Sequence, residues 1–205
     1  MESTLMAGAE LVTLFGNQLD EVSKARVGGV KVVGGEKVSY RDLAQLLLAL
    51  AVVEVVTTGA GSLAEEQIKG RFRSRRELVL RATAAAPGFT GVVAAAATGG
   101  VEVKQLALAV IGREVASAET VLVSQAHASL EGTGAVTKAG SMGRKFGAAL
   151  GMSSYDVDDR GAEHLQPEWE RLRATWQGWR NANPDLAKRL LADCKDALAR
   201  ATSSE

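Results

Sequence analysis

The stretch over residues 43–53 constrains the fold more than any other part of this 205-residue chain. It consists of leucine, alanine and valine, interrupted only by Gln45 and followed by Glu54. A helix that is apolar on nearly all sides has to be buried on most of its faces. The run is about half as long as a membrane-spanning helix needs to be. We therefore expect a buried helix over residues 40–56, capped by Ser39, in a soluble protein with no membrane segment.

The composition favours a core of small residues in one domain. The length suits a single domain, or a domain with extensions, and aromatic residues make up only 4% of the chain. Alanine, valine and leucine therefore have to form the core. The single cysteine, Cys194, excludes an internal disulfide, and we expect it to be a core residue in a reducing compartment. The first ten residues contain no basic segment, so we expect no signal peptide and no secretion.

Apolar residues recur at helical spacing near both ends of the chain. We expect one helix that is capped by Ser3 and runs to about Lys24. Two Gly-Gly pairs after it bracket a β-branched run, which fits either a short β-hairpin or a flexible connector. Towards the other end, Pro167 opens a helix, and Asn183-Pro184 separates it from the last helix.

Three tryptophans share one side of the penultimate helix. They are Trp169, Trp176 and Trp179, and the apolar stripe continues in the last helix as Leu186, Leu190, Leu191, Cys194 and Leu198. Two amphipathic helices joined by a short turn bury their stripes together. We therefore expect an antiparallel pair within the subunit core. Because tryptophan and arginine are also favoured at contacts between chains, docking on a second subunit is the alternative.

The middle of the chain is predicted to be helical throughout. Ser62 and Glu65 match a capping box that would start one helix. Further helices are expected over residues 75–86, 89–97, 101–131 and 144–150, the third of them interrupted at Gly112. The sequence thus predicts a mostly α protein with three parts: an N-terminal helical arm followed by either a short β-hairpin or a flexible connector (1–38), a compact helical core (39–152) and a C-terminal helical pair (153–205).

No catalytic signature is present in the sequence. His127 and His164 have no further ligand at metal-binding spacing, and we expect His127 on a helix surface or at an interface. The acidic residues at 156–159 lack the glycine and the closing glutamate of a calcium loop. Gly59 and Gly61 resemble part of a dinucleotide-binding G-x-G-x-x-A motif, although a helical segment precedes them. We predict no catalytic residue, no metal and no cofactor; a dinucleotide-dependent enzyme that uses these glycines is an alternative.

Positive charge is concentrated between residues 69 and 81. The cluster consists of Lys69, Arg71, Arg73, Arg75, Arg76 and Arg81. In an extended chain alternate arginines line one side, whereas in a helix the residues three and four apart line up. Guanidinium groups at such spacing bind phosphates bidentately. The chain has no net charge, so the alternative is a solvated face on which these cations pair with nearby glutamates.

The segment RATAAAPGFT at residues 81–90, with the preceding ELVL, resembles a run in phlebovirus-type nucleoproteins. In that family a leucine-flanked arginine precedes an alanine-rich helix. Residues 144–152, RKFGAALGM, are similar to a basic helix near the C-terminus of those proteins. Coat proteins of flexible filamentous plant viruses share the general helical core. The resemblance implies an RNA groove lined by Arg75, Arg76, Arg81, Arg144 and Lys145.

We therefore expect a viral nucleoprotein or filamentous coat protein that polymerises on single-stranded RNA, in the virion or the host cytoplasm. It would form a homo-oligomer and contact phosphates rather than bases, because a coat has to cover any sequence. The N-terminal helix on its glycine-rich hinge, or the C-terminal tryptophans, would reach a neighbouring subunit. A non-enzymatic helical adaptor or scaffold protein is the alternative.

Overall fold

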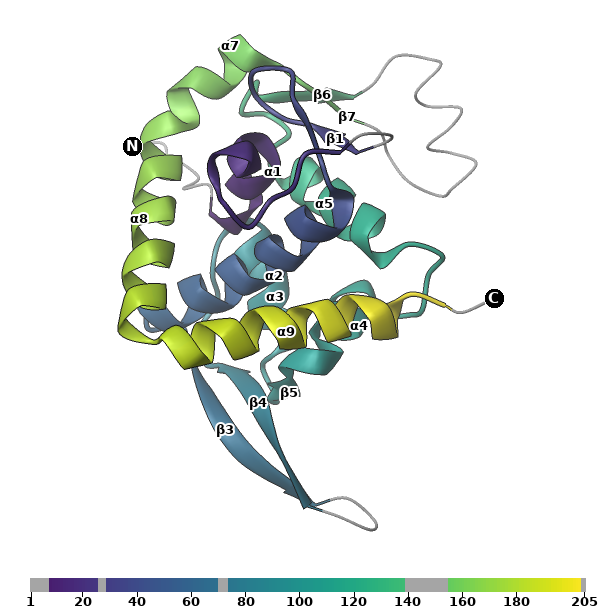
Figure 1. The fold of residues 1–205 in the computed structure, drawn as a ribbon, viewed down its shortest axis with the longest axis vertical. Coiled ribbons are helices and arrows are strands. Elements are labelled where there is room, and N and C mark those ends of the chain that lie inside the picture. Colours follow the sequence, from purple (N-terminus) through teal and green to yellow (C-terminus); the bar gives the residue numbers. More distant parts are fainter. Residues whose placement is uncertain (1–7, 26–28, 70–73, 139–154, 204–205) are drawn as a thin grey trace.

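The helix α2, Tyr40–Thr57, runs through the middle of the molecule (Figure 1). The fold is that of a computed structural model, which describes residues 8–25, 29–69, 74–138 and 155–203. The Ser39 hydroxyl accepts the Asp42 N–H at 3.3 Å and caps the helix. All residues from Leu46 to Val53 are buried. The predicted central helix is confirmed, and it organises the rest of the core.

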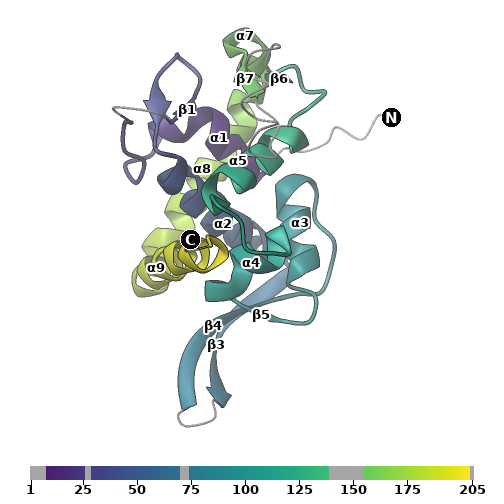
Figure 2. The same ribbon diagram turned by 90° about the vertical axis from the view of Figure 1, so that its right-hand side faces the viewer.

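Short and long helices cover α2 on several sides (Figures 1 and 2). α1, α3, α5, α8 and α9 all contact it. The remaining described helical segments are η1 (Ala9–Leu11), α1 (Val12–Phe15), η2 (Gly16–Gln18), α3 (Gly88–Ala96), η3 (Val103–Gln105), α4 (Leu106–Ile111), α5 (Ala118–Ser129), α7 (Asp159–Ala162), η4 (Glu163–Leu165), α8 (Gln166–Ala182) and α9 (Pro184–Ala201). Within the described residues no helix is both long and apolar enough to cross a bilayer.

Three small antiparallel sheets accompany the helices. Their strands are β1 (Val30–Lys31) with β2 (Lys37–Val38), β3 (Gly61–Lys69) with β4 (Ser74–Ala82) and β5 (Val101–Glu102), and β6 (Val136–Lys138) with β7 (Tyr155–Val157). The first pair forms a hairpin, one of the two alternatives that the sequence leaves open: Gly34 and Gly35 turn the chain with positive φ angles of 84° and 78°. The protein is therefore largely helical, with mixed α and β content.

The C-terminal helices confirm the predicted tryptophan core. Trp169 and Trp176 are fully buried, and Trp179 is half-buried. The Trp169 ring stacks on Phe15 with centroids 5.7 Å apart, and its Nε1–H donates to Gln18 at 2.7 Å. The helices do not form the expected antiparallel pair, however. α8 and α9 meet at a corner, and each packs on α2 (Figure 1).

The N-terminal segment is not the helical arm that its periodicity predicts. Only residues 9–18 of the described part are helical, and the chain from Leu19 to Lys24 is irregular. Leu11, Leu14 and Phe15 are buried in the same hydrophobic core as α2. The segment belongs to its own subunit because its apolar face is already covered. Residues 1–7, including the predicted cap Ser3, lie outside the described residues.

Two predicted helices in the middle of the chain are wrong. The capping-box segment that begins at Ser62 is β3, and most of residues 75–86 is β4. The two strands pair over nine residues each, from Gly61 opposite Ala82 to Lys69 opposite Ser74. This pairing satisfies the backbone groups that the two strands turn towards each other, and it outweighs the local helix signal.

The helices predicted over residues 89–97 and 101–131 agree more closely with the structure. Residues 89–97 largely form α3, as expected. The stretch over 101–131 is interrupted at Gly112, which has a left-handed φ of 80°, and α5 starts afresh at a Ser117 cap. The predicted helix over 144–150, with Arg144 and Lys145, lies outside the described residues.

His127 is buried, contrary to the expected surface position. Its ring makes an edge contact with Tyr155, with centroids 5.8 Å apart. Burial lowers the pKa of His127 from 6.5 to about 4, and a hydrogen bond to the Thr13 backbone opposes that shift. The unfolded chain therefore binds more protons than the folded chain between pH 6.5 and 4. Stability is unaffected by His127 above this window and falls as the pH is lowered through it.

We expect His127→Gln to remove this pH dependence. Between pH 7 and 4 the unfolding free energy of the wild type should fall by about 3 kcal/mol more than that of the variant. Urea titrations of both proteins at several pH values measure the difference. The carboxyl groups contribute equally to the pH dependence of stability in both proteins. Their contribution therefore cancels when the two unfolding free energies are subtracted. Identical pH profiles would show that protonation of His127 is not coupled to folding.

Candidate functional site

The paired strands β3 and β4 project from the helical body as a long hairpin (Figures 1 and 2). We call residues 61–82 the hairpin arm. At its root the side chains of Leu78 and Leu80 are buried, whereas the described residues of its far half, 67–69 and 74–76, are mostly exposed. Four of the eight cations predicted to bind nucleic acid, Lys69, Arg75, Arg76 and Arg81, lie on the described strands of this arm. These four belong to a β-hairpin rather than to a helix.

Strand alternation separates the arginines onto two faces of the arm. Arg75 and Arg81 lie on one face, together with Glu66 and Glu77. Lys69 and Arg76 lie on the opposite face, and this face also carries the buried Leu78 and Leu80 at its root. Arg75 and Arg76 are neighbours in sequence but point apart. The predicted groove lined by Arg75, Arg76 and Arg81 therefore does not form on one surface.

Two of the predicted site residues are engaged in ion pairs. The Arg81 guanidinium binds Glu66 bidentately, with Nε–Oε1 and Nη2–Oε2 distances of 2.8 and 2.9 Å. Arg75 contacts Glu102 at 2.8 Å and Glu77 at 3.2 Å. Glu66 raises the pKa of Arg81 further through a hydrogen bond. These contacts match the alternative in which the cations pair with nearby glutamates.

The far end of the arm differs from its root. Among the described residues, no ion pair involves the side chain of Lys69 or Arg76, and both are exposed. The sequence KGRFRSRR from Lys69 to Arg76 contains no acidic residue. Arg71 and Arg73 in this run lie outside the described residues. Among the described residues, Lys69 and Arg76 are thus positive charges at the end of the arm that no carboxylate compensates.

A buried ionic cluster fixes the root of the arm to α9. Lys104 Nζ lies 3.1 Å from Glu77 Oε2 and 3.7 Å from Asp193 Oδ1, and both carboxylates are almost fully buried. Arg189 donates to the Arg76 carbonyl at 2.7 Å and also binds Glu65. Burial raises the pKa of Asp193, and the charges of Lys104 and Arg189 oppose this shift. The cluster holds the arm at a defined angle to the helices.

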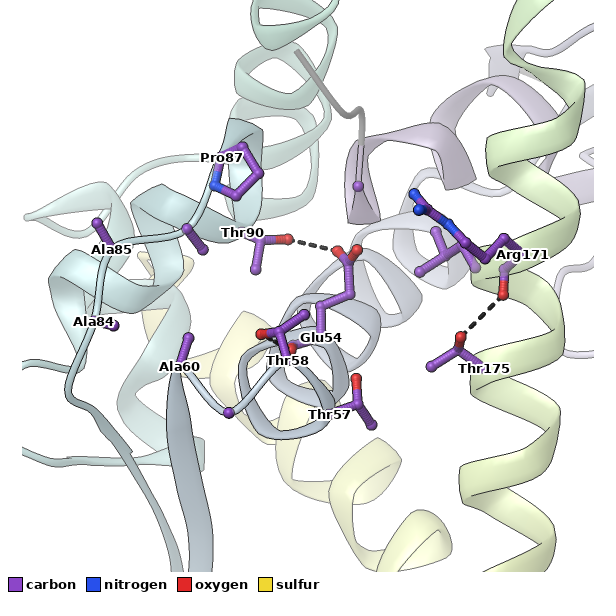
Figure 3. A pocket seen from close by; sticks show the side chains of 14 residues that line it. Glu54, Thr57, Thr58, Ala60, Ala84, Ala85, Pro87, Thr90, Arg171 and Thr175 are labelled. Atoms are coloured by element: carbon purple, nitrogen blue, oxygen red, sulfur yellow. Dashed lines mark hydrogen bonds between the residues drawn. The ribbon is translucent and has the colours of Figure 1, made fainter. Parts of the chain in front are cut away.

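A cavity of about 520 Å³ lies beside the root of the arm (Figure 3). The end of α2, the connector from Ala84 to Pro87, the start of α3 and one side of α8 form its walls. Among the described residues, the charged side chains that line it are Glu54 and Arg171. This volume lies in the range of small-molecule sites.

Glu54 is the central polar group of the cavity. Its Oε2 accepts the Thr90 hydroxyl and the Ala9 N–H, both at 2.6 Å. Burial raises the pKa of Glu54, while these hydrogen bonds and the charge of Arg171 lower it. Nearby, Glu10 accepts the Phe89 N–H at 3.2 Å, and burial raises its pKa as well. Both carboxylates hold backbone segments in place, and only Glu54 also lines the cavity.

No motif in the sequence indicates this cavity. The available signal was Glu54 itself, a carboxylate within an otherwise apolar helical stretch that has to be buried. Arg171 and Thr175 come from α8, more than 100 residues away in the sequence. No local pattern indicates that they would face Glu54, because the packing of α8 brings them there.

The glycines of the dinucleotide alternative lie at the edge of the same cavity. Gly59 lines it, but the glycines connect a helix to a strand, α2 to β3. A pyrophosphate-binding loop connects a strand to a helix N-terminus, where backbone N–H groups face the ligand. A Cβ atom at Gly61 would collide with the Arg81 carbonyl. Close pairing of β3 with β4 therefore accounts for Gly61.

The residues considered for metal binding have structural roles. The Asp158 carboxylate caps α7 by accepting the N–H groups of Arg160 and Gly161. In the part of the chain that the structure describes, no cluster of histidine, cysteine, aspartate and glutamate could hold a metal ion. Cys194 is fully buried, which raises the pKa of its thiol far above its usual value.

Comparison with protein-family models, with curated proteins and with solved structures yields no match to this chain. The functional inference therefore depends on the geometry of the hairpin arm and the cavity. It defines a largely helical body with a projecting basic β-hairpin and a separate small cavity.

Proposed function

We propose that this chain is a non-enzymatic protein that binds single-stranded RNA through the far end of the hairpin arm. The observation that carries the proposal is the exposed, unpaired positive charge of Lys69 and Arg76 on a projecting element. The adjoining sequence adds Arg71, Arg73 and Phe72 with no acidic residue. Arginines that bind phosphates, together with an aromatic side chain on which bases stack, suit single-stranded RNA.

The proposed contact is independent of base sequence. A two-stranded arm presents side chains at regular intervals along its length. Lysine and arginine contacts to phosphates position a protein on a nucleic acid without reading its bases. The overall net charge of zero restricts such binding to the arm, because the helical body has no excess of positive charge.

Self-association is part of the proposal. β3 forms an edge of its sheet, with only β4 paired to it among the described strands. Its nine residues present backbone N–H and C=O groups that a second chain could pair with. Contacts between subunits would add to a modest affinity of each arm for RNA. Such an assembly would serve as a viral nucleoprotein or filamentous coat, in agreement with the resemblance noted in the sequence.

A matched pair of double variants tests the role of the arm. We expect Lys69→Gln/Arg76→Gln to weaken binding to any single-stranded RNA at least tenfold in low salt, because two phosphate contacts are lost. The slope of log affinity against log salt should fall by roughly 1.4, about 0.7 for each contact. Fluorescence anisotropy with two unrelated RNA sequences measures both quantities, and the loss should be equal for the two.

The control is Arg75→Gln/Arg81→Gln, which removes the same formal charge. Since these arginines are paired with glutamates, the salt slope should change by less than half as much. An unchanged slope in the first variant would reject the arm as the RNA site. Size-exclusion chromatography with the 260/280 nm absorbance ratio adds an independent check: a small oligomer free of nucleic acid would favour the scaffold alternative instead.

A further inference from the structure

The cavity beside the arm has walls that are rich in hydrogen-bond acceptors. Four threonines line it, and each hydroxyl already donates its hydrogen within the protein. Thr57 donates to the Val53 carbonyl at 2.8 Å, and Thr175 to the Arg171 carbonyl at 3.0 Å. A hydroxyl has one hydrogen and two lone pairs, so these groups can offer a ligand only acceptors.

The remaining two threonines follow the same pattern, on either side of Glu54. Thr58 donates to the Glu54 carbonyl and Thr90 to the Glu54 carboxylate, each at 2.6 Å. The carboxylate of Glu54 is a further acceptor and carries the negative charge. Figure 3 shows it between Thr90 and the α2 end of the cavity. A ligand that donates several hydrogen bonds is therefore better matched than one that only accepts them.

The helix ends around the cavity also favour a cation. α2 ends at Thr57, so the negative end of its dipole lies at the cavity wall. α3 begins beside the cavity with its positive end, but Glu10 accepts the Phe89 N–H there and offsets it. Arg171 is the opposing charge. It is exposed on α8, and its charge lowers the pKa of Glu54, although the two side chains form no direct ion pair among the described residues.

We propose that this cavity binds a small organic cation, an amine or guanidinium group carried on an apolar body. The cationic head would donate to the Glu54 carboxylate and to the threonine hydroxyls. The apolar body would pack on Ala60, Ala85 and Leu172 in the cavity wall. This site is separate from the RNA-binding end of the arm, so either proposal can fail without the other.

Three probes of matched shape test the sign of the preferred charge. They are 2-phenylethylammonium, 2-phenylethanol and 3-phenylpropionate, which differ mainly in the charge of the head group. We expect only the ammonium compound to bind in isothermal titration calorimetry and to raise Tm in a thermal shift assay. Tighter binding of the carboxylate, or no binding by any of the three, would overturn the proposal.

Two substitutions should change the affinity for the ammonium probe in opposite directions. Glu54→Gln keeps an acceptor for Thr90 and Ala9 but removes the charge, so the affinity should fall at least tenfold. Arg171→Gln removes a repelling cation and should tighten binding by up to about fivefold. The reverse pattern would identify an anion site and contradict the assignment.

A third variant keeps the test valid if Glu54→Gln does not fold. Ala85→Leu places a larger side chain in the cavity from the exposed connector and leaves Glu54 unchanged. It should abolish binding of the ammonium probe while Tm without ligand stays near the wild-type value. RNA affinity should be the same in all three variants. If Ala85→Leu bound the ammonium probe as tightly as the wild type does, the probe would bind outside this cavity and the proposal would be wrong.

Discussion

Replacing Trp176 with alanine should lower the free energy of unfolding by about 3–5 kcal/mol, the usual cost of emptying a large buried aromatic site. Trp176 is fully buried within a single chain, and its Nε1–H donates to Glu21 at 3.3 Å. It therefore stabilises the isolated subunit, whatever the state of assembly. Urea denaturation of the dilute protein, followed by circular dichroism, measures the change.

The adjacent Trp179 provides the control for this prediction. It stacks on Trp176 with centroids 6.1 Å apart but is only half-buried. Trp179→Ala should therefore cost clearly less than Trp176→Ala, because less apolar area returns to water. Tryptophan emission of the wild type should be blue-shifted in dilute solution and should not move with protein concentration. A Trp176→Ala subunit of wild-type stability that fails to assemble would instead support the interface alternative.

Lys104→Met is expected to destabilise the protein by about 3 kcal/mol at neutral pH, because two buried carboxylates each lose a charged partner. The substitution keeps the apolar stem of the side chain but removes the cation that Glu77 and Asp193 share. Glu77 keeps Arg75 at 3.2 Å and Asp193 keeps Arg189 at 3.9 Å, so neither carboxylate is left entirely without a cation. The decrease in the free energy of unfolding should be smaller at acid pH. Burial already raises the pKa of Asp193, so this carboxylate can then take up a proton and lose its charge.

Lys138→Met is the surface counterpart of this variant. Lys138 pairs with Glu131 at 3.0 Å, and both side chains are substantially exposed. Such a pair contributes at most about 1 kcal/mol, so this variant should remain close to the wild type. Guanidinium chloride would screen the charges under test, so urea is the denaturant of choice. Equal losses in the two variants would mean that the cluster at the root of the arm is not the buried ionic anchor that its geometry indicates.

Sequence patterns correctly predict the helices that bury a continuous apolar stripe. α2, α8 and α9 lie where apolar periodicity and the Ser39, Pro167 and Asn183-Pro184 signals place them. The burial of Trp169, Trp176 and Cys194 follows from the same stripes. These features depend on apolar residues spaced three and four positions apart, and this spacing can be seen directly in the sequence.

The hairpin arm shows where local patterns fail. The capping-box signal at Ser62 and Glu65 is real, yet the segment pairs as a strand with residues up to 21 positions away. A capping box contributes only on the order of 1 kcal/mol, whereas the ladder satisfies a whole row of backbone groups. The charge cluster itself was visible in the sequence. Its division into ion-paired Arg75 and Arg81 and unpaired Lys69 and Arg76 was not, because strand alternation decides it.

The buried central helix, the tryptophan and leucine stripes and the concentration of arginine at one place in the chain can all be predicted from local patterns. Each of these depends on residue type and short-range spacing. In contrast, the basic segment projects as a β-hairpin, Lys104 joins Glu77 to Asp193, and Arg171 faces Glu54 across a cavity only because of the three-dimensional packing. Those arrangements join residues that lie far apart in the chain, and the free energy that selects them comes from packing and long-range pairing, which no local pattern contains.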